Sequence, residues 1–201
     1  MNKGRLEAFS DGVFAIAITL LVLELRVPDL KGTGDSALAA ALLAQWPQYL
    51  VYAVSFAMIG IMWLNHHAIF QNIEKVSYAL LMSNLLLLMA ISFLPYPTLV
   101  LAHYGPTPIT ILFYGIVLTV IALAYRALFF AADPPPDVPA IIGYLTQWNP
   151  WTTVGLLSYL AAIALGWYNP LVSIGLFAAV AVFYALPSSI TIALRRGRHG
   201  A

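Results

Sequence analysis

The chain has 201 residues, of which 62% are hydrophobic and 8% are charged, and its formal net charge is +1. Soluble domains carry about 25% charged residues, so this chain has too few polar side chains to cover a core in water. The composition therefore excludes both a free soluble enzyme and a disordered chain. The small net charge provides no basic field for nucleic acid, and the absence of cysteine excludes disulfides and thiolate metal sites. The composition therefore predicts an all-α integral membrane protein, with lipid around most of its surface.

Six apolar stretches are long enough, or nearly long enough, to cross a hydrocarbon core of about 30 Å as helices. They cover residues 9–27, 47–69, 77–94, 108–131, 150–166 and 170–194. The connections between them are short and contain no run that would mark a second domain. The sequence therefore predicts one domain, residues 1–201, with six transmembrane helices.

Proline marks the boundaries of several predicted helices. A capping side chain precedes proline at the start of three stretches, in Thr107-Pro108, Asn149-Pro150 and Asn169-Pro170. Proline suits the first helical position, because the N–H that it lacks would have no partner there. Other prolines should end or kink a helix; these are Pro95 and Pro97, directly after the third stretch, and Pro187 in the sixth.

Lysine and arginine residues predict the orientation of the helices. If the N-terminus is cytoplasmic, that side carries Lys3, Arg5, Lys75, Arg126, Arg195, Arg196 and Arg198. The opposite side then carries only Arg26 and Lys31. This distribution satisfies the positive-inside rule and places both termini in the cytoplasm.

The first helix contains the densest set of polar residues. Ser10 and Asp11 lie at its cytoplasmic end, and a simple helix cap explains them poorly, because Val13 stands where a capping box has Glu or Gln. Further along, Gly12, Ile16, Thr19, Leu20 and Leu23 recur at helical spacing and share one stripe. Because the whole helix is apolar, spacing alone does not distinguish this stripe from lipid-facing residues.

The other polar residues do not assemble a metal site or a catalytic site. His66 and His67 are adjacent and point about 100° apart on a helix, so they do not chelate as a pair. One of them is expected to bind a buried partner and the other to face headgroups or water. Phosphate-binding loops, serine-hydrolase elbows and His-Glu-x-x-His motifs are absent. The sequence therefore predicts no metal, no cofactor and no enzyme activity.

The segment Arg5-Leu6-Glu7-Ala8-Phe9-Ser10-Asp11 resembles the Arg-x-x-x-Phe-Ser-Asp signature of the transmembrane-protein-175 family of potassium channels. That family includes an endosomal and lysosomal animal channel with two six-helix repeats and bacterial members with one. The length, helix count and orientation of this chain resemble the single-repeat bacterial form. The resemblance implies a homotetrameric, potassium-selective leak channel that spans the inner membrane of a bacterium several times, with K⁺ as the permeant ion.

The resemblance also implies roles for individual residues. The first helix of each subunit lines the pore, and the constriction falls on Ile16, Thr19, Leu20 and Leu23. The signature forms a packing network at the base of that helix, through Arg5, Phe9, Ser10 and Asp11, with Trp63 and His67 as the expected partners. The chain has no Thr-Val-Gly-Tyr-Gly loop that could supply a filter of backbone carbonyls.

Two alternatives stay open at this stage. A proton-permeable channel or proton-coupled transporter could use Asp11 and His67 as a relay. Glu24 follows Leu20 by four residues, so it either rings the outer mouth of the pore and concentrates cations or pairs locally with Arg26 or Lys31.

Overall fold

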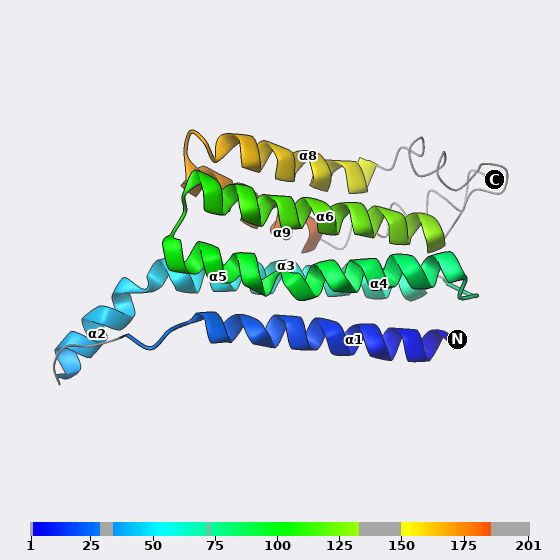
Figure 1. Ribbon diagram of the computed structural model, residues 1–201, viewed down its shortest axis with the longest axis horizontal. Helices are drawn as coiled ribbons and strands as arrows, with labels where there is room; N and C mark the ends of the chain where they lie inside the picture. Colours follow the sequence, from blue (N-terminus) through cyan, green and yellow to red (C-terminus); the bar gives the residue numbers. More distant parts are fainter. Residues whose placement is uncertain (1, 29–33, 72, 133–149, 186–201) are drawn as a thin grey trace.

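A computed structural model describes residues 2–28, 34–71, 73–132 and 150–185, and all regular secondary structure in these ranges is helical (Figure 1). The elements are α1 (Lys3–Leu20), the 3₁₀ helix η1 (Leu21–Glu24), α2 (Asp35–Ala44), α3 (Trp46–Gln71), α4 (Tyr78–Phe93), α5 (Pro95–Tyr104), α6 (Pro108–Ala132), α8 (Pro150–Leu165) and α9 (Pro170–Ala185). The prediction of an all-helical membrane protein is confirmed.

Four helical segments are long and apolar enough to cross a membrane, and they are Lys3–Leu23, Trp46–Gln71, Tyr78–Tyr104 and Pro108–Ala132. The apolar helices α8 and α9 are shorter, at 16 residues each. They pack against each other and against α6. Four spans are thus evident within the described residues, and the predicted fifth and sixth correspond to α8 and α9.

Proline acts at the helix boundaries largely as predicted. Pro108, Pro150 and Pro170 are each the first residue of a helix. Asn169 caps the last of these helices, since its side-chain oxygen accepts a hydrogen bond from the backbone N–H of Leu171 at 3.0 Å. The prediction for Pro187 lies outside the described residues.

The third predicted span is interrupted at Leu94 and continues beyond it. Leu94 has helical backbone angles (φ −59°, ψ −34°) and joins α4 to α5, which begins at Pro95. The Leu94 carbonyl accepts from the backbone N–H of Thr98 at 3.3 Å and from its hydroxyl at 2.9 Å, so helical hydrogen bonding resumes directly after the interruption. The prolines therefore break the regular hydrogen-bond pattern while the chain keeps its direction.

Two boundaries near the N-terminus differ from the sequence prediction. Helix α1 begins at Lys3, six residues before the predicted span, because polar residues extend the helix beyond its apolar part. The segment between the first two spans, which the sequence analysis treated as a connection, contains the ten-residue helix α2. A search for stretches of about 20 apolar residues does not detect so short a helix.

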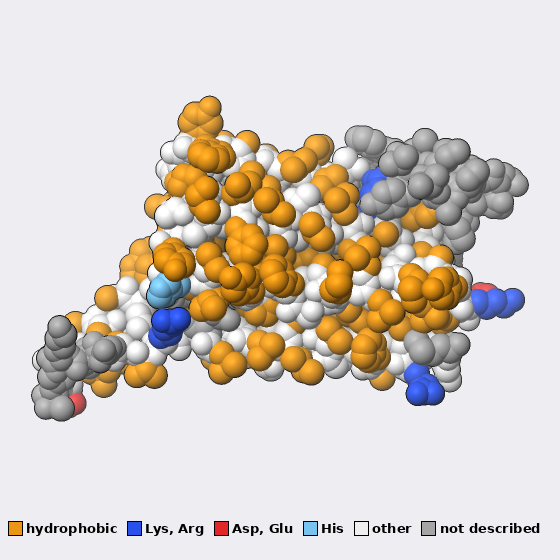
Figure 2. Space-filling model, in the orientation of Figure 1, with side chains coloured by type: hydrophobic (Ala, Val, Ile, Leu, Met, Phe, Trp, Pro, Cys, Tyr) orange, Lys and Arg blue, Asp and Glu red, His pale blue; other side chains and the backbone are white. Residues whose placement is uncertain are grey.

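Apart from α2, the helices run roughly along one common axis, and α1 forms one edge of the bundle (Figure 1). Helix α1 packs on α3 and α4, while α6 lies between α4 and α8. Apolar side chains cover the visible flank, and charged side chains gather toward the two ends (Figure 2). The Lys3 ammonium donates to the Gln71 carbonyl at 3.5 Å, so the start of α1 and the end of α3 lie at the same end of the bundle.

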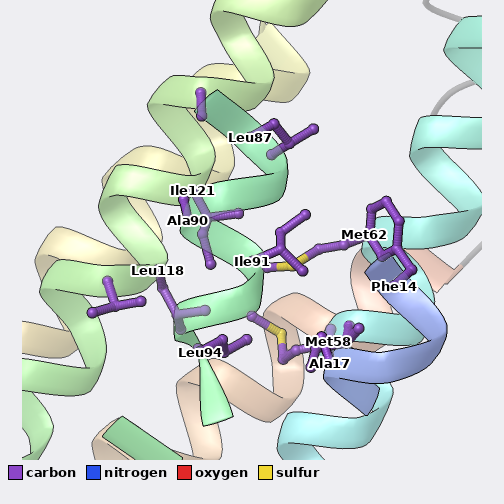
Figure 3. Close-up of a cluster of buried hydrophobic side chains, with 14 of the residues drawn as sticks. Phe14, Ala17, Met58, Met62, Leu87, Ala90, Ile91, Leu94, Leu118 and Ile121 are labelled. Atoms are coloured by element: carbon purple, nitrogen blue, oxygen red, sulfur yellow. The ribbon is translucent and has the colours of Figure 1, made fainter. Parts of the chain in front are cut away.

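The core between α1, α3, α4 and α6 is apolar and closely packed (Figure 3). Its buried side chains include Phe14, Ala17, Met58, Met62, Leu87, Ala90, Ile91, Leu94, Leu118 and Ile121. The Tyr125 hydroxyl of α6 donates to the Met62 carbonyl of α3. This core holds α1 against the bundle through one side only.

Candidate pore-lining face and its supporting network

Helix α1 has one buried face. Leu6, Ser10, Phe14 and Ala17 are the buried residues of this helix, and Leu21 continues the series into η1. Their spacing of four, four, three and four residues keeps them on one side of an α-helix. The polar Ser10 is fully buried among them, so this face carries both the apolar packing of α1 and a polar contact.

The opposite face of α1 is uncovered. At about 100° per residue, Gly12, Ile16 and Thr19 lie roughly opposite the buried face, and Leu23 follows them in η1. Ile16 is 62% exposed and Leu23 is 72% exposed. A side chain added at Gly12 would meet no atom within 4 Å. The stripe identified in the sequence is therefore the part of α1 that the other described residues leave free, with Leu20 (41% exposed) at its margin.

The orientation of the Thr19 hydroxyl makes it an acceptor on this uncovered face. Its oxygen lies 2.9 Å from the Ala15 carbonyl and 3.0 Å from the Ile16 carbonyl, and it donates its proton to them. A hydroxyl has a single proton and two lone pairs. The proton is used inside the helix, so the lone pairs remain available to a ligand that approaches the exposed side.

A buried polar network fixes the inner half of α1. The Ser10 hydroxyl donates to the Leu6 carbonyl at 2.8 Å and accepts from the Asn84 amide at 3.0 Å. The Asn84 oxygen lies 2.8 Å from His66 Nε2. Because the amide nitrogen of Asn84 donates to Ser10, its oxygen accepts, and His66 Nε2 carries the proton. All three side chains are buried, and the network joins α1, α4 and α3.

A second polar contact joins α1 to α3 at the surface. The Trp63 indole N–H donates to Asp11 Oδ1 at 2.8 Å. The ring of His67 stacks on Trp63, with ring centroids 6.0 Å apart. His67 Nε2 also lies 3.1 Å from the amide nitrogen of Gln71. Asp11 is exposed and lies to one side of the uncovered stripe.

The signature residues thus fall into two groups. Ser10 and Asp11 contact neighbouring helices, whereas Arg5 and Phe9 are exposed. Among the described residues, Arg5 forms no ion pair. His67 reaches the signature only through the ring of Trp63, and His66 is the histidine that connects to Ser10.

Sequence reasoning missed the specific roles of two residues. The sequence predicted His67, and not His66, as a partner of the signature, although His66 is the one that contacts Asn84. Adjacent positions on an apolar helix carry no signal of which one faces the bundle. The sequence did not single out Asn84, although this residue connects Ser10 to His66. The side chain of Glu24 lies outside the described part of the chain. No group of three metal-ligating side chains is present in the residues that the structure describes.

Replacing Asp11 by alanine should lower the yield of assembled protein and leave ion selectivity unchanged, because Asp11 holds α3 and lies beside the stripe. Trp63→Phe breaks the same hydrogen bond but keeps the aromatic ring, and it should share the defect. Size-exclusion chromatography of both variants measures assembly, and flux from the assembled fraction measures selectivity. A fully assembled Asp11→Ala variant with altered selectivity would place Asp11 in the ion path instead.

Comparisons with known proteins bear directly on this arrangement. A family model described as the endosomal/lysosomal potassium channel TMEM175 matches residues 5–95. A potassium channel of Streptomyces collinus is 39% identical over 196 residues, covering 92% of each chain. A potassium channel of Chamaesiphon minutus is 38% identical over 194 residues, covering 94% of this chain and 96% of the other. The human endosomal/lysosomal proton channel TMEM175 is 42% identical over 101 residues, which are 47% of this chain and 20% of the human one.

A solved structure shares the fold. The crystal structure of a lysosomal potassium-selective channel TMEM175 homolog from Chamaesiphon minutus aligns with a TM-score of 0.79. Its sequence is 39% identical, and the alignment covers 92% of this chain and 97% of that one. The similarity therefore extends over almost the whole chain.

Proposed function

Because this chain belongs to the TMEM175 family of potassium channels, we propose that it is a potassium-selective leak channel whose pore is lined by the uncovered face of α1. The family predicted from the segment Arg5–Asp11 is confirmed, and it is a family of ion channels. The observation that carries the proposal is the division of α1 into a face packed on the bundle and an opposite face that nothing in the described chain covers.

The pore requires several copies of the chain. One α1 helix cannot enclose a path for ions, and closed cyclic symmetry is the usual arrangement of identical subunits. We propose a homotetramer in which four α1 helices surround the axis. The packing of α1 on α3 and α4 supports this arrangement, since it leaves the stripe at the edge of the bundle (Figure 1).

The side chains of the stripe suggest how such a pore selects ions. Ile16, Leu20 and Leu23 would form apolar rings, and a narrow apolar constriction opposes water and ions by dewetting. K⁺ loses its hydration shell at a lower cost than Na⁺, so a tight pore with few replacement ligands favours K⁺. The outward lone pairs of Thr19 provide a ring of four acceptors, which offsets part of that cost.

Features of the bundle also support a location in a membrane and an orientation across it. We propose that the chain spans a bacterial inner membrane six times, with α8 and α9 as the last two spans. The apolar flank and the charged ends of the bundle support a position across a bilayer (Figure 2). The cluster of Lys3, Arg5 and Lys75 near one end favours a cytoplasmic location for that end.

Ion replacement in liposomes that contain the purified protein tests the proposed function. With a potassium gradient and equal pH on both sides, the reversal potential should follow the potassium gradient, and replacing K⁺ by Na⁺ should reduce the flux. A reversal potential that ignores potassium and follows only a pH gradient would contradict the proposal.

A proton-permeable channel is the second candidate function, because the animal relatives that match about half of this chain are named proton channels. The contacts of Asp11 give this alternative limited support. Asp11 and His67 both touch Trp63 and are not hydrogen-bonded to each other. An indole N–H donates but does not accept, so Trp63 cannot relay protons between them. The pH-gradient arm of the liposome experiment distinguishes the two functions.

A further inference from the structure

Among the residues that the structure describes, helix α2 is held by the rest of the protein at one end only. Every residue of α2 is exposed except Ala41, which is half-buried, and none is buried. At its C-terminal end the Gln45 amide donates to the Arg26 carbonyl at 3.0 Å, which fixes it beside the end of the first span. From there α2 extends away from the bundle and past the edge that α1 forms (Figure 1).

The composition of α2 is inconsistent with water around it. Eight of its ten residues are alanine or leucine, and Leu43 is 75% exposed. Isolated helices shorter than about 12–15 residues are marginal in water even when they are rich in alanine. The helix therefore needs a partner that covers its apolar surface.

A lipid environment also fits α2 poorly. A helix that lies in the membrane surface has a polar face opposite its apolar face, but α2 has no polar residue between Ser36 and Gln45. A ten-residue helix is about 15 Å long, which is half the thickness of the hydrocarbon core. A helix that is apolar all round is buried either in protein or as a membrane span, and α2 is too short for a span.

We propose that α2 packs against a second copy of this chain at the outer end of the assembly. It extends past the edge of the bundle that α1 forms (Figure 1), and the uncovered stripe lies on the face of α1 opposite its contacts with the bundle. This placement rests on the proposed function, since a pore lined by α1 puts the other subunits on that side. The five alanines of α2 allow a neighbouring helix to approach closely, so α2 continues the subunit contact from α1 to the outer surface.

Site-specific photocrosslinking in intact membranes tests this contact. The photoreactive amino acid p-benzoylphenylalanine replaces Leu43 in the full chain, and a second variant carries it at Leu38. The matched control carries it at Tyr168, which is 90% exposed and lies in the turn between α8 and α9. That turn is at the same end of the bundle but on the side away from α1 (Figure 1).

Illumination should produce several-fold more covalent dimer from the α2 variants than from the Tyr168 control. Crosslinks from Leu43 and Leu38 that reach only lipid, or only the same chain, would overturn the inference. The size of the uncrosslinked particle separates the two proposals. A tetramer without α2 crosslinks would refute the contact and leave the channel in place, whereas a monomer would refute both.

Discussion

Asparagine in place of Leu23 should raise both potassium and sodium flux through the assembled channel and reduce its preference for potassium. Leu23 lies in η1, which continues α1, and is 72% exposed, so four copies would place four amides at one level of the pore. These amides wet an apolar constriction and offer ligands to any small cation. A barrier lowered by about 1.4 kcal/mol would increase the flux about tenfold. Ile16→Asn should act in the same direction.

Val22→Asn is the matched control for this prediction. Val22 precedes Leu23 and points about 120° away from it in the 3₁₀ helix η1. An amide there faces lipid or a helix contact, so it should reduce stability without increasing flux. Flux is compared between tetramers of verified size. An increased sodium leak in Val22→Asn alone would mean that the pore lies on a different side of α1.

Leucine in place of Asn84 should strongly destabilise the protein. Asn84 accepts from His66 and donates to Ser10 within a buried network, and its loss leaves the His66 N–H without that acceptor. An unpaired buried donor or acceptor costs about 1–3 kcal/mol. Thermal unfolding in detergent should therefore show a large fall in Tm, with little assembled protein recovered.

The double variant Asn84→Leu/His66→Phe provides the control. Replacing both partners of a buried hydrogen bond by apolar groups of similar shape can be nearly neutral, and Phe preserves the ring that stacks on Phe70 at 4.3 Å and contacts Phe14. The double variant should therefore be more stable than Asn84→Leu alone. An Asn84→Leu protein with the Tm of the unaltered chain would show that the network does not stabilise the fold.

The sequence predicted the stripe of α1 because two independent features agreed. Helical spacing predicted that Ile16, Thr19 and Leu23 share one stripe, and the signature at Arg5–Asp11 indicated the family to which this first helix belongs. In the structure these side chains lie opposite Ser10 and Phe14. The helix starts at Pro108 and Pro170 were also predictable, because proline and the residue before it act locally.

The features that the sequence did not reveal depend on tertiary contacts. The choice of His66 over His67 follows from which residue faces Asn84, 18 residues further along the chain. Helix α2 escaped prediction because eight alanines and leucines are too few to be recognised as a span. The continuation of α4 into α5 through Leu94 depends on the packing around Thr98, which the prolines do not encode.

Cadmium block of single-cysteine variants tests most directly whether the uncovered face of α1 lines the pore. The chain has no cysteine, so Ile16→Cys, Leu23→Cys and the buried-face control Ala17→Cys each carry one thiol per subunit. Thiolates are strong ligands for soft metal ions, and several of them at one level of a pore would hold Cd²⁺ in the ion path. We expect Cd²⁺ to block potassium flux through tetramers of the first two variants, reversibly on chelation, and to leave the Ala17→Cys variant unaffected. Block of Ala17→Cys alone, or of none of the three in conducting tetramers, would contradict the account.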